Sequence, residues 1–214
     1  MKIILTSEFH CVSNKLLELW HIQWNKKIAF VQNAVDIRIN NWETIHRIES
    51  AKERYSNNWF ALDIIDLRLL QDKELIKKLQ QYDYLHIHGW DNKYLHDICR
   101  KSWLYDSIYQ LLHEWLVYIG SSAGSIITWP DTTYSIATST NFKSDLSQEE
   151  LESMNFRWFQ LHPFYLIPHF NKTDRLEMSI ERLKYCHKHN LYPYLTFADN
   201  QAIIIENGKF EFIS

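Results

Sequence analysis

The chain has 214 residues, a mass of 25.9 kDa and a formal net charge of −3. This length suits a single α/β domain over residues 1–214, with one core that buries roughly 70% of the surface exposed by the unfolded chain. With an isoelectric point near 6.4 and scattered basic residues, the chain lacks the charge pattern of a nucleic-acid binder.

The apolar segments and the cysteines indicate a compartment. No apolar run reaches the length of a signal peptide or of a membrane span, so we expect no membrane partner. The three cysteines lie far apart without Cys-x-x-Cys spacing, which is typical of reduced thiols. We therefore expect a cytoplasmic protein; the oligomeric state is left open.

The first half of the chain alternates strands and helices. Strands are predicted over 2–6, 27–31, 60–66 and 84–89. Helices are predicted after a Ser13-Asn14 cap with Leu16, Leu17, Leu19 and Trp20 on the apolar face, over 42–55, and over 74–81 with Asp72 as its cap. Such alternation is typical of a parallel sheet with helices on both faces.

The second half continues this pattern and ends in strands. Helical segments are predicted over 92–113, from 125, over 146–154, and from Thr173 or Asp174 to His189 with Leu176, Ile180 and Leu183 as the apolar stripe. Strands are predicted over 114–119, 134–137, 164–170, 194–197, 202–205 and 210–213. The fold class is therefore α/β, a doubly wound, mostly parallel sheet with a β-rich C-terminal hairpin turning at Asn207-Gly208.

An apolar strand runs directly into Gly120-Ser121-Ser122-Ala123-Gly124. This Gly-x-Ser-x-Gly pattern is typical of a nucleophile elbow, in which a serine sits at a tight strand-to-helix corner and small neighbours make room for the backbone. The pattern is short, and an ordinary strand-to-helix turn is the alternative.

Glycine is scarce, with 4 residues in the chain where average usage would give roughly 15. Gly120 and Gly124 flank Ser122, and Gly89 follows another apolar strand. These three glycines lie where a hydrolase needs close approach of backbone segments. A composition bias that leaves glycine only in tight turns explains the scarcity equally well.

A serine hydroxyl needs a base, and the base needs an orienting acid. Among 11 histidines, His169 is favoured because it ends a buried-type strand, whereas His162 precedes Pro163 at the strand's beginning. For the acid, Asp199 follows the strand over 194–197 at the same expected edge. Asp174 suits a helix cap better, and Glu206 a turn.

These segments carry a family resemblance. The segments 118–125, 167–170 and 199–203 resemble the nucleophile, histidine and acid segments of the peptidase E (alpha-aspartyl dipeptidase) family, relatives of class I glutamine amidotransferases. The order Ser, His, acid also differs from α/β-hydrolases, which place the acid before the histidine. The resemblance implies Ser122 as nucleophile, His169 as base and Asp199 as carboxylate.

The resemblance also implies a place for substrate. Arg175 falls near a basic position of the family's helix after the histidine, where it would meet an acidic substrate side chain; an ordinary solvated charge is the alternative. The family's glycine-rich loop is replaced by His88-Gly89-Trp90-Asp91-Asn92, and Trp90 narrows the expected cleft. An aspartate of the family is also replaced around residues 140–142.

These observations leave three hypotheses for the function. The first is a serine peptidase acting on short peptides, including dipeptides with an acidic N-terminal residue, with an oxyanion hole from the backbone N–H groups of Ala123 and of Gly89 or Trp90. The second is a weak or inactive relative that binds a metabolite or a protein in the same cleft. The third, a metal site at His86-x-His88, has no acidic or cysteine partner in sequence, and core packing is favoured. We therefore expect no cofactor and no metal.

Overall fold

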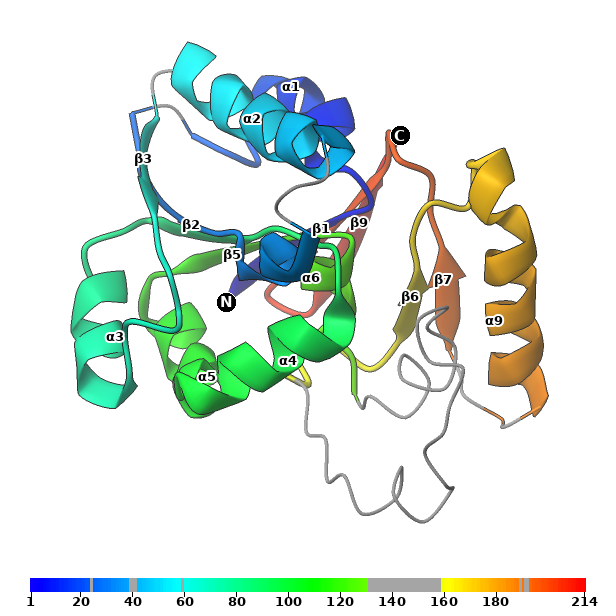
Figure 1. Cartoon of the computed structure of the whole chain (residues 1–214). Coiled ribbons are helices and arrows are strands. Elements are labelled where there is room, and N and C mark those ends of the chain that lie inside the picture. Colours follow the sequence, from blue (N-terminus) through cyan, green and yellow to red (C-terminus); the bar gives the residue numbers. More distant parts are fainter. Residues whose placement is uncertain (24, 39–41, 59, 131–158, 189, 191–192) are drawn as a thin grey trace.

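The computed structural model describes the chain except residues 24, 39–41, 59, 131–158, 189 and 191–192. Seven strands form one sheet in the order β3-β2-β4-β5-β1-β8-β9 (Figure 1). Its strands are β1 (Lys2–Thr6), β2 (Lys27–Val31), β3 (Ala61–Ile64), β4 (Tyr84–Ile87), β5 (Val117–Ser121), β8 (Ala202–Glu206) and β9 (Lys209–Ile213). The first five are parallel, and the β8–β9 hairpin joins antiparallel to β1. The predicted fold class is confirmed.

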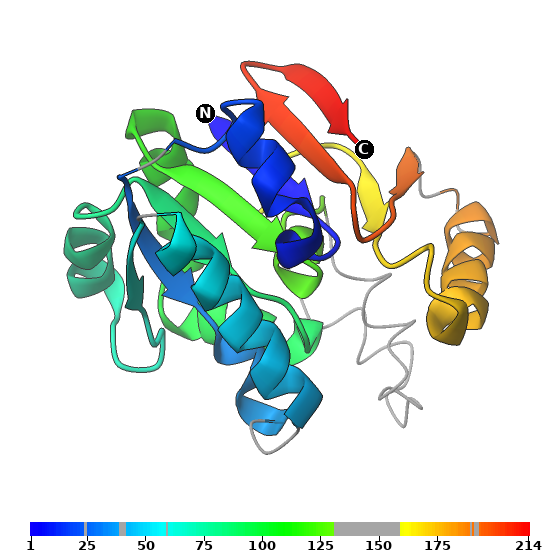
Figure 2. The same cartoon turned by 90° about the horizontal axis from the view of Figure 1, so that it is seen from above.

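Helices cover both faces of this sheet, as Figures 1 and 2 show. The helices α1 (Phe9–Glu18) and α2 (Trp42–Asn57) lie on one face, and α3 (Asp72–Leu79), α4 (Asn92–Lys101) and α5 (Leu104–Glu114) lie on the other. A 3-10 helix, η1 (Asn33–Arg38), follows β2, and the short helix α6 (Ala123–Ile126) follows β5. Because strands between two helical layers have both faces in the core, β4 and most of β5 are buried throughout.

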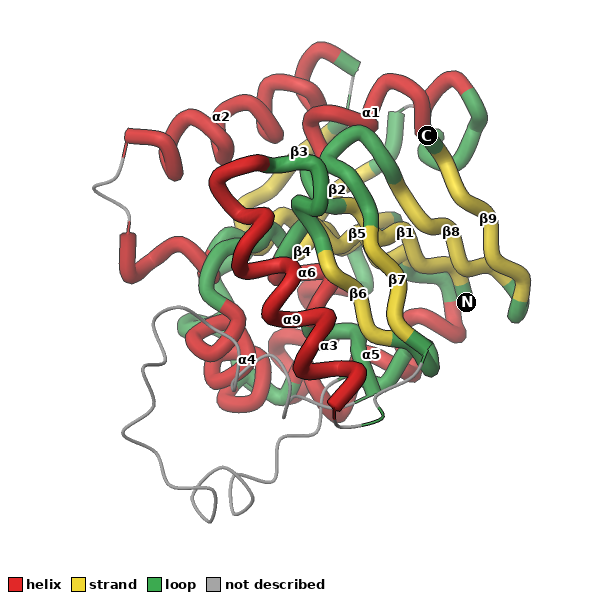
Figure 3. Tube along the Cα trace, turned by 90° about the vertical axis from the view of Figure 1, so that its right-hand side faces the viewer, coloured by secondary structure: helices red, strands yellow, loops and turns green. Residues whose placement is uncertain are grey.

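A second, two-stranded sheet stands beside the first. Its parallel strands are β6 (Tyr165–Ile167) and β7 (Tyr194–Thr196). The 3-10 helix η2 (Thr173–Arg175) and helix α9 (Leu176–Lys188) connect them, and α9 runs alongside them in Figures 1 and 3. The segment that follows β6 and the turn between β7 and β8 therefore lie between this small sheet and the main sheet.

Two predicted helix faces are wrong in part: Leu16 and Leu17 are buried as predicted, but other residues of the two faces are not. Helix α1 begins at Phe9, earlier than Ser13, and ends at Glu18, so Leu19 and Trp20 lie beyond it and are exposed. In α9 the buried residues are Ser179, Arg182 and Cys186, whereas Leu176 and Ile180 are each 40% exposed. Apolar spacing gave the wrong face of α9 because the helix turns a mixed polar side toward its small two-stranded sheet.

Two other boundaries also differ from prediction. Residues 92–113 form two helices, not one, because Trp103 adopts a left-handed conformation (φ 65°) between them. Asp72 does not cap its helix, since Gln71 occupies the cap position and Asp72 is the first helical residue. The predicted strand over 134–137 and helix over 146–154 lie outside the described residues. In the part that is described, no helix is long and apolar enough to cross a membrane.

Candidate active site

The turn after β5 has the geometry of a nucleophile elbow. Ser122 stands between the strand and α6 with φ 51° and ψ −111°, a strained conformation for a residue with a side chain. Its backbone N–H donates to the carbonyl of Thr6, at 3.0 Å, which ties the corner to the end of β1. The Ser122 side chain is half-buried, so its hydroxyl remains open to a small reactant.

Close backbone packing explains the glycines around this corner. A Cβ on Gly124 would lie 2.0 Å from the carbonyl oxygen of Ile87, and one on Gly120 would lie 2.7 Å from the carbonyl oxygen of Gly124. A Cβ on Gly89 would lie 2.2 Å from the Ser121 oxygen and 2.3 Å from the Ala123 nitrogen. The ends of β4 and β5 thus meet at a distance that only glycine permits, and the close approach predicted for these three glycines is confirmed.

His169 lies just after β6, and the structure brings it to the serine. Its Nε2 is 2.8 Å from Ser122 Oγ, and its Nδ1 is 2.7 Å from Asp199 Oδ1. His169 is 2% exposed and adopts a left-handed backbone conformation (φ 63°) just beyond the strand. Since the Asp199 carboxylate accepts a hydrogen bond from the N–H at Nδ1, the neutral ring presents an unprotonated Nε2 to the serine hydroxyl.

Asp199 lies between β7 and β8, at the edge of the main sheet where β1 ends. The pairing of Thr6 with Ala202 places the beginning of β8 at this edge. The backbone N–H of Asp199 donates to Asn171 Oδ1 at 3.0 Å, which fixes the turn. The three residues named from sequence are therefore joined in one hydrogen-bonded row.

Ser7, which the sequence did not single out, belongs to the same row. Its hydroxyl donates to Asp199 Oδ1 at 2.6 Å and accepts from the backbone N–H of His169 at 2.8 Å. It follows β1 directly, so the rule that ligands gather beyond the carboxyl ends of parallel strands would have found it. Ser7 holds the acid and the histidine in one orientation.

Two charged residues, also missed from sequence, complete the surroundings. Glu8 is 3% exposed, and its Oε1 lies 3.8 Å from His169 Nδ1. Lys172 places its Nζ 3.1 Å from Asp199 Oδ2 and 3.6 Å from Glu8 Oε1. The site therefore contains two carboxylates, one imidazole and one ammonium group.

These neighbours set the protonation states. Burial lowers the pKa of His169, although the hydrogen bond to Asp199 and the charge of Glu8 oppose that shift. Burial also acts against ionisation of Asp199, but the hydrogen bonds from His169 and Ser7 outweigh it and hold the pKa of this carboxyl below its usual value. At neutral pH the pair is thus a neutral imidazole beside a carboxylate.

The remaining residues named from sequence lie around Ser122 or apart from it. Ala123 begins α6, and the first N–H groups of a helix have no acceptor within it. The backbone of Gly89 packs directly against Ala123, and Trp90 follows Gly89 as a half-buried side chain. Arg175 is half-exposed in η2, and its charge acts on His169. His162 bonds to Thr128 Oγ1 at 2.7 Å and is not part of the row.

A metal could use some of these groups. Among the described residues, Glu8, His169 and Asp199 offer ligand atoms within 4.8 Å of one another. The Lys172 ammonium group and the Ser7 hydroxyl already contact the same side chains, so their charges and hydrogen bonds are matched without an ion. The cluster therefore fits an internal ion pair better than a metal centre.

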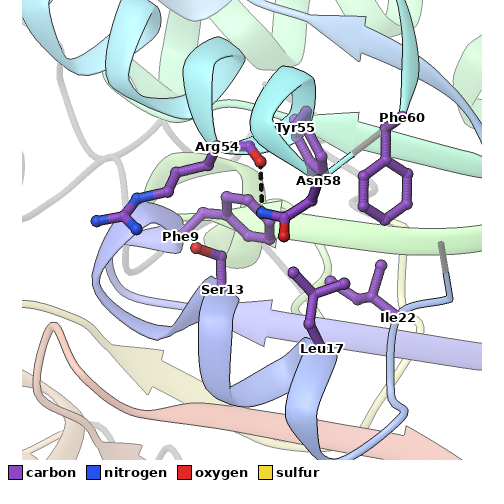
Figure 4. A pocket seen from close by; sticks show the side chains of 8 residues that line it. All are labelled: Phe9, Ser13, Leu17, Ile22, Arg54, Tyr55, Asn58 and Phe60. Carbon is purple, nitrogen blue, oxygen red and sulfur yellow. Dashed lines mark hydrogen bonds between the residues drawn. The ribbon is translucent and has the colours of Figure 1, made fainter.

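His86 lies in β4 and His88 just after it, and neither belongs to that cluster. Both are buried, and His86 packs against the rings of Phe9, Phe30 and Tyr55. Beside them, a hollow between α1 and α2 (Figure 4) has no room for a water-sized body. Its lining residues are Phe9, Ser13, Leu17, Ile22, Arg54, Tyr55, Asn58 and Phe60. Neither feature offers a second binding site.

Comparison with known proteins also points to a peptidase. The family model of peptidase family S51 matches residues 3–213. An uncharacterized peptidase of Listeria monocytogenes is 24% identical over 97% of this chain and 95% of its own length, and one of Pasteurella multocida is 23% identical over 96% and 94%. A crystal structure of a candidate peptidase E from Listeria monocytogenes superposes with a TM-score of 0.81 at 20% identity, covering 99% of this chain and 97% of that one. A peptidase from an acI-B1 Actinobacterium gives a TM-score of 0.65 at 14% identity, over 99% and 86%.

The class follows from these matches: this is an α/β peptidase of the serine type. The chain belongs to peptidase family S51, the peptidase E family, which matches it over nearly its whole length.

Proposed function

We propose that the protein hydrolyses short peptides through a Ser122–His169–Asp199 triad and an acyl-enzyme. The observation that carries this proposal is the continuous row of contacts, 2.8 Å from Ser122 Oγ to His169 Nε2 and 2.7 Å from His169 Nδ1 to Asp199 Oδ1. Three loops that are distant in sequence supply these groups. A structural histidine has no need of a half-exposed serine on one nitrogen and a buried carboxylate on the other.

The proposed reaction begins at the serine. The neutral Nε2 of His169 takes the hydroxyl proton as Ser122 Oγ bonds to the peptide carbonyl carbon, and the imidazolium that forms is stabilised by Asp199. His169 then returns the proton to the leaving amine. Water then attacks the acyl carbon: His169 takes a proton from the water and gives it to Ser122 Oγ as the ester bond breaks, which frees Ser122.

The developing oxyanion needs preorganised donors. The backbone N–H of Ala123, at the beginning of α6, and that of Gly89 or Trp90 lie on the two sides of the elbow and form the proposed hole. In this proposal the Gly89-Trp90 segment, in place of a glycine-rich loop, still supplies a backbone donor, and the Trp90 ring limits the size of the substrate. This favours short peptides over folded proteins.

Arg175 suggests the substrate's charge. It lies half-exposed near His169, on the segment that follows the histidine, and Lys172 is occupied by carboxylates. Arg175 therefore supplies the positive group for an acidic N-terminal residue, as in Asp-Leu. We expect Asp-Leu to be cleaved faster than Asn-Leu, and Arg175→Gln to reduce that preference by at least about tenfold.

Covalent labelling tests the nucleophile without a known substrate. A fluorophosphonate probe should label the wild type and not Ser122→Ala, while the control Ser121→Ala, whose hydroxyl accepts a hydrogen bond from the Phe9 N–H in the core, should still react. Labelling that persists in Ser122→Ala would contradict the assignment. A folded wild-type protein that never labels, and that cleaves no short peptide, would instead favour a relative that only binds ligands in this cleft.

A further inference from the structure

Glu8 is a buried carboxylate that the triad itself does not require. It is 3% exposed and lies at the beginning of α1, one residue after Ser7. Its Oε1 is 3.8 Å from His169 Nδ1, beyond hydrogen-bond length but close enough for a strong charge interaction. Glu8 therefore acts on the ring through its field, whereas Asp199 also orients the ring.

Lys172 explains why a second carboxylate is useful. Its Nζ contacts Asp199 Oδ2 at 3.1 Å and so cancels part of the charge that Asp199 offers to the ring. The same ammonium group lies 3.6 Å from Glu8 Oε1, and its side chain is 27% exposed. With both carboxylates ionised, one ammonium and one imidazolium give a neutral cluster, and without Glu8 the cluster would carry a surplus positive charge in a buried position.

The other charged or titratable groups facing His169 come from three segments. The turn before α1 contributes Ser7 and Glu8, and Glu8 Oε2 lies 3.6 Å from His10 Nδ1. Burial raises the pKa of Cys11, and the charges of Glu8 and Asp199 also help to raise it. The segment after β6 contributes Lys172 and Arg175, and the turn after β7 contributes Asp199. Glu8 and Arg175 act on His169 in opposite directions.

We propose that Glu8 is a positioning residue of the peptidase site, which acts through His169 by stabilising its protonated form, with Lys172 holding Glu8 and Asp199 on either side. This role deepens, and rests on, the proposed triad. Glu8 and Lys172 then act as a pair, and removal of either charge changes the pH at which the His169 ring gains its proton.

An NMR titration of the resting protein tests this without any substrate. In the full chain with ¹⁵N-labelled histidine, Glu8→Gln should lower the titration midpoint of His169 by about one pH unit. Glu8→Asp, which keeps the charge, should restore most of the wild-type midpoint. Arg175→Gln should raise the midpoint, because it removes an opposing positive charge. The control Glu181→Gln, an exposed residue on α9, should leave it unchanged.

The outcomes separate the two proposals. A midpoint that stays in place or rises in Glu8→Gln, or one that moves in the same direction in Glu8→Gln and Arg175→Gln, would overturn the role of Glu8. If Glu8→Gln does not fold, Lys172→Met takes its place and should raise the midpoint; no rise would overturn the pairing. The titration does not depend on turnover, so failure of Ser122 to label would sink the peptidase mechanism and leave this measurement valid.

Discussion

Two buried histidine sites lie near the end of β4 and β5, and they differ in their partners. His169 is 2% exposed and contacts a serine hydroxyl, a carboxylate and a second carboxylate at longer range. His86 is fully buried, bonds through Nδ1 to the Tyr55 hydroxyl at 3.0 Å, and leaves Nε2 without a partner among the described residues. Burial lowers the pKa of both rings, but only His169 has negative charges that resist the shift.

Burial alone therefore does not distinguish a histidine that can exchange a proton with a reactant from one that is packed in the core. At His169, groups from several loops are arranged so that a proton can be taken up and given back. At His86, the ring serves as a flat, weakly polar side chain among aromatic neighbours. The predicted preference for core packing over a metal site at His86-x-His88 agrees with this arrangement.

The largest effect is expected on peptide cleavage, when the carboxylate beside His169 is changed and replacement of His86 serves as the comparison. Asp199→Asn should reduce the rate of peptide cleavage by about 1,000-fold or more, because the amide favours the wrong imidazole tautomer and cannot stabilise an imidazolium. His86→Phe should leave kcat within a few-fold of wild type. Steady-state kinetics of Asp-Leu cleavage measures both. Equal losses in the two variants would mean that the comparison between the sites is wrong.

A smaller effect is expected at Gly89, which connects the two regions by following His88. Gly89→Ala should lower the free energy of unfolding by about 3 kcal/mol, since its Cβ would overlap backbone atoms that belong to the elbow. Gly208→Ala is the matched control: its Cβ meets nothing within 4 Å, and its φ of 75° alone should cost about 1 kcal/mol. Urea unfolding compares the two, and a reversed order would contradict the packing described for the elbow.

The smallest effect is a pH dependence of stability that belongs to the packed site. Because burial lowers the folded-state pKa of His86, the unfolded chain binds more protons below the ordinary histidine pKa of about 6.5. The contribution is therefore complete above that pH and is lost as pH falls. His86→Phe should reduce the slope of stability against pH between about 6 and 5 by roughly 1 kcal/mol per pH unit. Burial also lowers the pKa values of His96 to about 4 and His162 to about 3, so part of the slope should remain.

Thermal unfolding across this pH range measures that slope. An unchanged slope in His86→Phe would show that the ring is protonated equally in both states. His162→Phe is a useful companion variant, because the His162 ring also has an aromatic neighbour: it stacks on Phe164, with the two ring centroids 4.0 Å apart. Its loss should reduce the slope in the same direction.

Local patterns were enough for much of the fold. Strands β1 and β2 were predicted to the residue, and the sequence order of strands and helices gave the doubly wound sheet. The failures occurred where spacing alone could not decide which side of a helix meets the core, as at Leu176 and Ile180 of α9. Nor could spacing foresee the left-handed Trp103, which breaks one predicted helix into two.

The site divided in a similar way. Ser122, His169 and Asp199 were reached from a motif, from strand ends and from a family resemblance, and their catalytic roles remain proposals for the experiments above. Ser7, Glu8 and Lys172 were missed, because a serine, a glutamate and a lysine in turns resemble ordinary surface residues until the loops meet.

Residues near one another along the chain suffice to predict the alternation of strands and helices and the glycine-flanked corner, and comparison of the whole sequence gives the membership of family S51. Which polar groups interact through hydrogen bonds and charge depends on the tertiary structure. Glu8 and Asp199 are separated by most of the chain and meet because β8 runs antiparallel beside β1, which brings both of their turns to the same edge of the sheet. Hydrogen bonds and charge interactions depend on distance in space, and that distance is fixed by strand order.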